Sequence, residues 1–447
     1  MGALPGEAII FPPWPDPHPE FCNQINASVR KYLGLATFDF ADHIKERTYI
    51  LKSLPVSALH SCVTLLDSGV DGLVSSMTPK QVPGYSMQAS TEKKFVVKET
   101  PVGSSMGLGM FALVNMPKNT LIDAEHPVII TPYVIGVHVP TAEIYQLIFG
   151  KLGMDVQMAF SELCGSRKDG KAKSDSLYES IMKANSLPVE LPVLDPGDKR
   201  AELSCHRGLF LNASRINHSC SPNALWTWDL DSFTLQLRSV RHIRADEEIT
   251  VAYVPPELSF QERRNLLRER YGFECHCTHC CSVEVAKSDS ARLFLTQFWD
   301  DGRTRLPAFR RWCEDLSLSP DMLIEAHKQA LGLIQREGLE VLNAVAPSSE
   351  SSQFLRDVAR HVDAVAMCYG ALQDVENFRF WIKQSRGCRS VPNDVFDHGR
   401  EGDSGLAALD RWLVDPSSFP AWGWRGAVKE GIVCRTSHGS LHDFVSA

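Results

Sequence analysis

Short hydrophobic runs separated by turn residues dominate the middle of the chain. Runs of this length, bounded by Gly, Pro, Asn and Ser, are typical of short β-strands rather than of amphipathic helices. The predicted strands cover residues 95–97, 107–114, 127–131, 209–212, 225–228, 234–240 and 249–254. This part of the chain is therefore expected to form small β-sheets.

Two other parts of the chain show the three- and four-residue spacing of helices. Within residues 133–205, Ile144, Leu147 and Ile148 follow this spacing, and the polar stretch 166–176 interrupts it. A further helix is predicted for residues 256–271, and helical spacing continues from residue 285 to about 385. The pattern predicts an α+β fold, in which a helical insertion splits the strand-rich domain and a mostly helical domain follows it.

The two ends of the chain show no comparable period. Residues 1–93 are expected to form an irregular arm, which holds six prolines in its first 20 residues, and then a mixed helical region. Residues 386–447 are expected to form an irregular tail, because Gly, Pro, Trp and Ser are scattered through them. Neither end is assigned any chemistry.

Composition narrows the classes of partner. The 447 residues carry a formal net charge of −8, which argues against a general binder of nucleic-acid phosphates. An acidic balance is compatible with a lysine-rich peptide. No apolar run reaches 18 residues, and neither a secretory signal nor a lipid-anchor motif is found, so we expect an intracellular protein that does not contact the membrane.

Four of the thirteen cysteines crowd together at positions 275, 277, 280 and 281. Cys275, Cys277 and Cys280 place three thiolates within six residues, which is a spacing that wraps around one tetrahedral zinc ion and leaves its fourth position open. A ligand distant in the sequence must complete the site. Cys281, directly after Cys280, makes the spacing of the ligands ambiguous, and His276 and His279 are alternative ligands.

Residues 107–112, GLGMFA, match the letters of a dinucleotide-binding fingerprint. That fold requires a helix directly after the glycines, and Pro117 leaves no room for one. The glycines either let the backbone approach a ligand closely or form a plain turn. A second segment, SRINHSCSPN at 214–223, places many polar and reactive side chains directly after a predicted strand. This segment is either part of a functional site or a plain polar loop that caps the strand.

Four motifs in this order resemble the SET methyltransferase family: GxGxFA, SRxNHSCxPN, EEITxxY at 247–253 and RYGFxCxCxxC at 270–280. The resemblance is closest to the SET-and-MYND group and its fungal-type relatives. It implies a SET domain at residues 94–255 with a helical insertion at about 133–205, a cysteine-rich post-SET segment at 256–284 and a helical repeat-like domain at 285–385. The MYND finger is missing, because it needs its own cluster of Cys and His, and Cys164 is the one cysteine between Ala112 and Cys205.

The resemblance also implies a reaction and a set of site residues. The expected activity is transfer of a methyl group from S-adenosylmethionine to lysine of a protein, histone or not, in the nucleus or cytoplasm. Tyr253 would be the catalytic tyrosine, and Cys220 would be the fourth zinc ligand beside Cys275, Cys277 and Cys280. The cofactor would be bound by Gly107, Leu108, Gly109, Asn217, His218, Tyr253 and Phe273.

Two other functions compete with this interpretation. A SET fold retained as an interaction module, capturing peptides through its C-terminal helices, is favoured where the cofactor-binding Asn, the tyrosine or the aromatic residue is absent. Asn217, Tyr253 and Phe273 are all present. Zinc-dependent hydrolysis requires an open coordination position, which a site of four thiolates does not offer.

Overall fold

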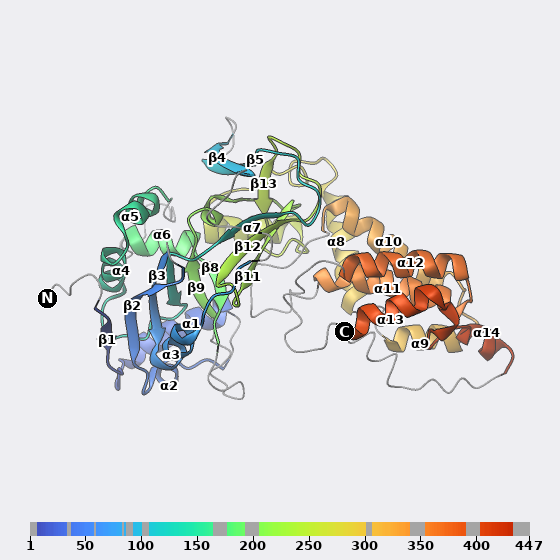
Figure 1. Cartoon of the computed structure of the whole chain (residues 1–447), viewed down its shortest axis with the longest axis horizontal. Coiled ribbons are helices and arrows are strands. Elements are labelled where there is room, and N and C mark those ends of the chain that lie inside the picture. Colours follow the sequence, from blue (N-terminus) through green and yellow to red (C-terminus); the bar gives the residue numbers. More distant parts are fainter. Residues whose placement is uncertain are drawn as a thin grey trace.

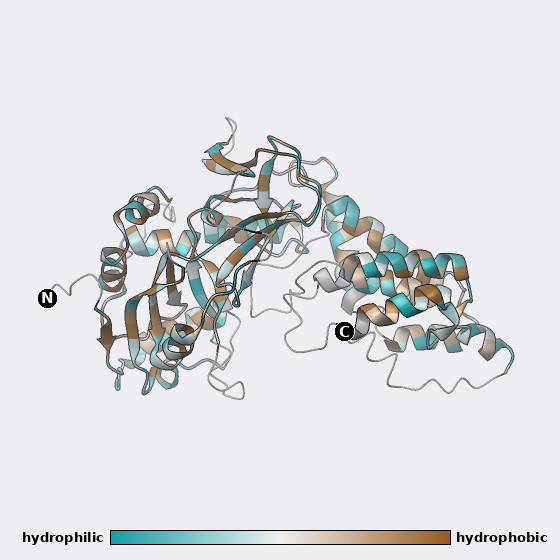
Figure 2. Ribbon diagram, in the orientation of Figure 1, coloured by the Kyte–Doolittle hydropathy of each residue, from teal (hydrophilic) through white to brown (hydrophobic). Residues whose placement is uncertain are grey.

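The computed structural model has a strand-rich part toward the N-terminus and a set of helices toward the C-terminus (Figure 1). It describes residues 7–33, 37–57, 60–82, 85, 93–100, 107–163, 177–192, 205–300, 306–339, 354–389 and 403–431. The predicted α+β class is confirmed, since three small sheets precede the helical part. Figure 2 shows hydrophobic residues in the strands and a mixture of hydrophobic and hydrophilic residues along the C-terminal helices.

A six-stranded sheet lies at the N-terminal end and has the order β1-β2-β3-β7-β9-β8. Its strands are β1 (Ile9–Phe11), β2 (Tyr49–Pro55), β3 (Ser61–Asp67), β7 (Ile129–Pro132), β8 (Leu187–Glu190) and β9 (Cys205–Leu209). Helices α1 (Pro19–Leu33), α2 (Phe40–Ile44) and α3 (Ser68–Ser76) accompany it.

The predicted irregular arm and mixed helical region are therefore wrong for β1, β2 and β3. Strands β2 and β3 pair antiparallel along their whole length, and β3 continues into the sheet by parallel pairing with β7. Leu51 and Leu65 are fully buried by this pairing. The spacing of the apolar residues in this segment is compatible with a helix or a strand. Pairing with strands distant in the sequence favours the strand conformation.

Two smaller sheets hold the predicted motifs. One has the order β10-β13-β5-β4 and the other β11-β12-β6. Their strands are β4 (Phe95–Glu99), β5 (Leu108–Ala112), β6 (Leu121–Glu125), β10 (Asn217–His218), β11 (Ala224–Asp229), β12 (Thr234–Ser239) and β13 (Glu248–Val251). Met110, Leu237 and Ile249 are buried in one core that the sheets share. No helix lies in the described segment between β5 and β6, which confirms the exclusion of a dinucleotide-binding fold.

The helices expected within the insertion are present. They are α4 (Thr141–Gly150), α5 (Met154–Ser161) and α6 (Leu177–Asn185). The polar stretch 166–176 lies outside the described residues. The insertion also contributes strand β8, which pairs with β9 and joins the six-stranded sheet.

Helices make up most of the described residues after residue 259. They are α7 (Phe260–Tyr271), α8 (Val285–Asp300), α9 (Leu306–Glu314), α10 (Met322–Glu337), α11 (Phe354–Ala371), α12 (Val375–Arg389), α13 (Asp403–Val414) and α14 (Trp424–Lys429). The predicted irregular tail is wrong for α13 and α14. Leu409, Trp412 and Trp424 are buried in one core cluster with Phe378 of α12, so tertiary packing orders a segment whose sequence shows no clean period.

Candidate active site and metal centre

The loop at residues 214–223 is fixed to strand β13 through buried polar groups. Strand β10 pairs in parallel with β13, and the Ser219 N–H donates to the Val251 carbonyl at 2.9 Å. The amide of Asn223, which is 1% exposed, donates to the Glu248 carbonyl at 2.8 Å and accepts from the Thr250 N–H at 2.8 Å. This loop is therefore more than an exposed cap, because its polar side chains are committed to holding two strands together.

Gly109 of β5 lies against the side chain of Asn217. Its Nδ2 donates to the Leu108 carbonyl at 3.1 Å and to Oε1 of Glu248 at 2.7 Å. A Cβ at Gly109 would lie 2.5 Å from that Glu248 oxygen and 2.8 Å from Asn217 Nδ2. Gly107 has φ of +70°, a conformation that L side chains rarely adopt. The sequence assigned no role to Glu248, although it lies inside the EEITxxY motif.

The Gly109→Ala variant is expected to separate Asn217 from Glu248 and to lower the free energy of unfolding by about 1–3 kcal/mol, because the added methyl overpacks a filled corner. Chemical denaturation measures this change. Gly150→Ala is the matched control, because a Cβ at Gly150 meets nothing within 4 Å. Equal stability of the two variants would contradict the close approach at Gly109.

Tyr253 lies two residues after the end of β13, and its hydroxyl donates to the Ile216 carbonyl at 2.5 Å. Its ring centroid is 5.0 Å from that of Tyr271 and 6.3 Å from that of Phe273. Burial raises the pKa of the Tyr253 phenol well above its usual value, and Tyr271 and Glu248 raise it further. Tyr253 is thus a neutral hydroxyl near neutral pH. Sequence reasoning missed Tyr271, which its position in the RYGF motif could have indicated.

His218 connects this aromatic group to the cysteines. Its Nδ1 accepts from the backbone N–H of Tyr253 at 3.0 Å, and its Nε2 lies 3.3 Å from Sγ of Cys220. Burial lowers the pKa of His218 to about 4, so the ring is neutral at physiological pH. Because Nδ1 accepts a hydrogen bond, the single ring proton is on Nε2 and points at the sulfur.

Cys220, Cys275, Cys277 and Cys280 form a cluster, which we call the thiolate cluster. Their sulfurs all lie within 4.8 Å of one another, and Cys220 Sγ is 3.9 Å from Cys275 Sγ and 3.6 Å from Cys280 Sγ. A tetrahedral zinc about 2.3 Å from each sulfur would hold the sulfurs roughly 3.8 Å apart. The distances and the donor set therefore fit zinc, and Cys220 comes from the loop at 214–223, whereas the other three cysteines lie at positions 275–280.

The alternative ligands lie elsewhere. Nδ1 of His279 is 3.6 Å from a carboxylate oxygen of Glu337, and Nδ1 of His276 is 4.0 Å from Sγ of the exposed Cys281. Among the described residues, the thiolate cluster is the one group of three or more candidate ligands close enough to share an ion.

Comparison with known proteins agrees with this geometry. The family model described as SET domain matches residues 107–254, from Gly107 just before β5 to the residue after Tyr253. The chain contains a SET domain.

Among the described helices, none is long and apolar enough to cross a membrane.

Several curated proteins are similar to this chain. Histone-lysine N-methyltransferase set5 of Schizosaccharomyces pombe is 32% identical over 43% of this chain and 52% of its own length. Histone-lysine N-methyltransferase SMYD3 of Mus musculus is 31% identical over 53% of this chain and 57% of its own length. A SET and MYND domain-containing protein of Dictyostelium discoideum is 33% identical over 24% of this chain and 31% of its own length. The chain thus spans about half the length of the first two relatives.

Proposed function

We propose that this chain is an S-adenosylmethionine-dependent protein-lysine N-methyltransferase with a structural zinc. The observation that carries the proposal is the position of Tyr253, a partly buried residue whose hydroxyl is fixed to the Ile216 carbonyl beside strand β10 of Asn217. The names of the SET-domain relatives support the same chemistry. A histone or another protein is the proposed substrate, in the nucleus or the cytoplasm.

The residues around Asn217 fit the cofactor. Both hydrogens of the Asn217 amide are donated within the protein, so a bond to a ligand would be accepted by its Oδ1. An ammonium group, such as the one that S-adenosylmethionine carries, suits this acceptor. Gly107 and Gly109 allow the backbone of β5 to approach the cofactor, and Phe273 offers a ring face for adenine. Both ring nitrogens of His218 are used within the protein, so we expect the cofactor to meet its backbone.

The bound cofactor supplies the methyl group, and the protein must deliver a neutral amine to it. Neutralising a free lysine with a pKa of about 10.4 costs roughly 4.6 kcal/mol at pH 7. Tyr253 does not act as a base, because its raised pKa keeps the phenol protonated. Its hydroxyl donates to Ile216 and so presents its lone pairs elsewhere, where one of them accepts a hydrogen bond from the amine and orients it for in-line transfer.

The thiolate cluster holds the site together. We propose that zinc joins Cys220, on the loop of Asn217 and His218, to Cys275, Cys277 and Cys280, which follow Phe273. With all four positions filled by sulfur, the metal has a structural role rather than a catalytic one. Loss of the metal is then expected to disturb cofactor binding as well as local folding.

The Asn217→Ala variant tests the cofactor site. It is expected to bind S-adenosylmethionine at least severalfold more weakly, because the cofactor loses a buried polar partner that contributes about 1–3 kcal/mol. Isothermal titration calorimetry of the wild type and the variant measures the change. Binding of equal strength in both would show that the loop only connects two strands.

A further inference from the structure

The C-terminal end of helix α10 lies against the loop that carries Cys220. Gly338 ends this helix with φ of +63°, and a Cβ placed there would lie 1.8 Å from Oγ of Ser221. Only glycine combines this backbone conformation with so close an approach. The helical part of the chain therefore meets the SET domain at the residue next to a proposed zinc ligand.

Glu337, the last residue of α10, is a carboxylate in an unfavourable place. It is 3% exposed, and it stands at the end of a helix where the backbone dipole disfavours negative charge. A buried carboxylate remains charged only when it is paired and hydrogen-bonded. Four side chains surround it: Ser288 donates to Oε2, Arg292 and His279 each lie 3.6 Å from Oε2, and Arg336 lies 3.4 Å from Oε1.

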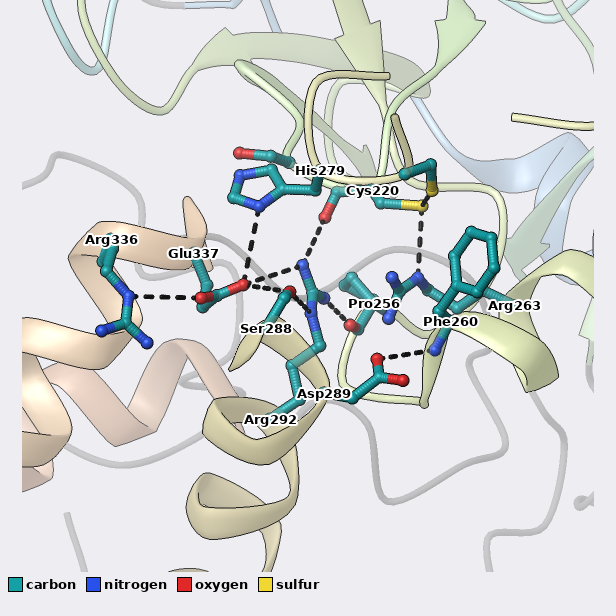
Figure 3. A network of polar contacts seen from close by, with 12 residues as sticks. Cys220, Pro256, Phe260, Arg263, His279, Ser288, Asp289, Arg292, Arg336 and Glu337 are labelled. Carbon is teal, nitrogen blue, oxygen red and sulfur yellow. Dashed lines mark hydrogen bonds and ion pairs between the residues drawn. The ribbon is translucent and has the colours of Figure 1, made fainter. Parts of the chain in front are cut away.

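Arg292 of helix α8 connects this carboxylate to the loop. The side chain is 1% exposed, and Figure 3 shows its guanidinium between Glu337 and Cys220. Its Nη2 donates to the Cys220 carbonyl at 3.4 Å, and its Nη1 donates to the Pro256 carbonyl. A second buried guanidinium, that of Arg263, donates from Nε to Sγ of Cys220 at 3.2 Å.

The charges of this network depend on one another. Four thiolates around a divalent zinc carry a net charge of about −2, which two guanidinium groups beside Cys220 offset. Glu337 faces the Arg292 guanidinium that donates to the Cys220 carbonyl, so its charge helps to hold that guanidinium in place, and removing one partner of this buried ion pair is costly.

We propose that Glu337 and Arg292 are positioning residues, through which helices α8 and α10 hold the Cys220 loop in the place that zinc and the cofactor require. The inference rests on the proposed function, because the same loop carries Asn217. It makes the C-terminal helices part of the metal centre rather than a separate appendage. Both residues are proposed to act through the Cys220 loop rather than by contact with the substrate.

Substitutions at Glu337 separate charge from shape. Glu337→Gln keeps the shape and removes the charge, so we expect it to release zinc to a chromogenic chelator about tenfold faster, at the low end for groups that support metal ligands. Its affinity for S-adenosylmethionine should fall severalfold. Glu337→Asp keeps the charge in a shorter side chain and should stay within about threefold of the wild type. A role in packing alone predicts the opposite order of the two variants.

Two further variants complete the experiment. Ser288→Ala removes the hydroxyl that donates to Glu337, and this variant should release zinc about threefold faster than the wild type. It tests the positioning role if Glu337→Gln does not fold. Glu325→Gln is the control, because Glu325 lies on the same helix with a side chain that is 69% exposed, and it should behave as the wild type.

The outcomes separate the two proposals. Wild-type protein that holds zinc and binds the cofactor, with Glu337→Gln and Ser288→Ala both indistinguishable from Glu325→Gln, would overturn the positioning role and leave the proposed function standing. Wild-type protein that holds no zinc and binds no cofactor would overturn both.

Discussion

Replacing Tyr253 with Phe is expected to lower the turnover of lysine methylation by about 100-fold or more, equivalent to roughly 2.7 kcal/mol, while cofactor affinity changes much less. The substitution keeps the ring that packs against Tyr271 and Phe273, so folding and ground-state binding should largely survive. It removes the oxygen that is fixed to Ile216 and that we propose orients the amine. Steady-state kinetics and calorimetry on the same preparations measure the two effects.

Tyr369→Phe provides the matched control for this substitution. Tyr369 lies on α11, and its hydroxyl is 2.9 Å from Nζ of Lys328, so the variant loses a hydroxyl outside the candidate site. Its turnover should equal that of the wild type. If Tyr253→Phe methylates protein as fast as Tyr369→Phe, the assignment of Tyr253 is wrong.

Replacing Cys277 with Ser is expected to remove the stoichiometric zinc and to unfold the region around the thiolate cluster. A structural zinc site contributes on the order of 10 kcal/mol to the folded state, which exceeds the net stability that most domains can lose. The loss should extend to cofactor binding, because Cys220 lies on the loop of Asn217. Elemental analysis, circular dichroism and calorimetry report these three losses.

Cys281 offers a neighbouring control. It is exposed, adjacent to Cys280 and outside the thiolate cluster, so Cys281→Ser should keep both its zinc and its fold. A Cys277→Ser protein that is stable, free of metal and still able to bind the cofactor would contradict a structural role for the metal.

The residues of the candidate site could be named from the sequence because four motifs resemble those of a known family, and the strands beside these motifs could be predicted because their hydrophobic pattern is local. The strands that contain Phe95, Trp226 and Ile249 agree with the prediction. The structure also brings Cys220 close to Cys275, although 55 positions separate them in the sequence. The assigned roles of these residues remain predictions for the experiments described above.

Features that depend on distant partners could not be predicted. Strands β2 and β3 exist because they pair with each other and with β7, and helices α13 and α14 depend on burial of Trp412 and Trp424. Glu248 and Glu337 look like ordinary charged residues in the sequence. Their roles follow from groups 31 and 45 residues away, namely Asn217 and Arg292, and no local pattern records such a pairing.

The measurement that tests the central proposal most directly is transfer of labelled methyl groups. Purified protein would be incubated with radiolabelled S-adenosylmethionine and a panel of histones and cell-extract proteins, and modified residues would be identified by mass spectrometry. We predict label on lysine side chains with the wild type and a loss of about 100-fold or more with Tyr253→Phe. Binding of the cofactor without label on any protein of the panel would contradict the proposed activity and favour an interaction module.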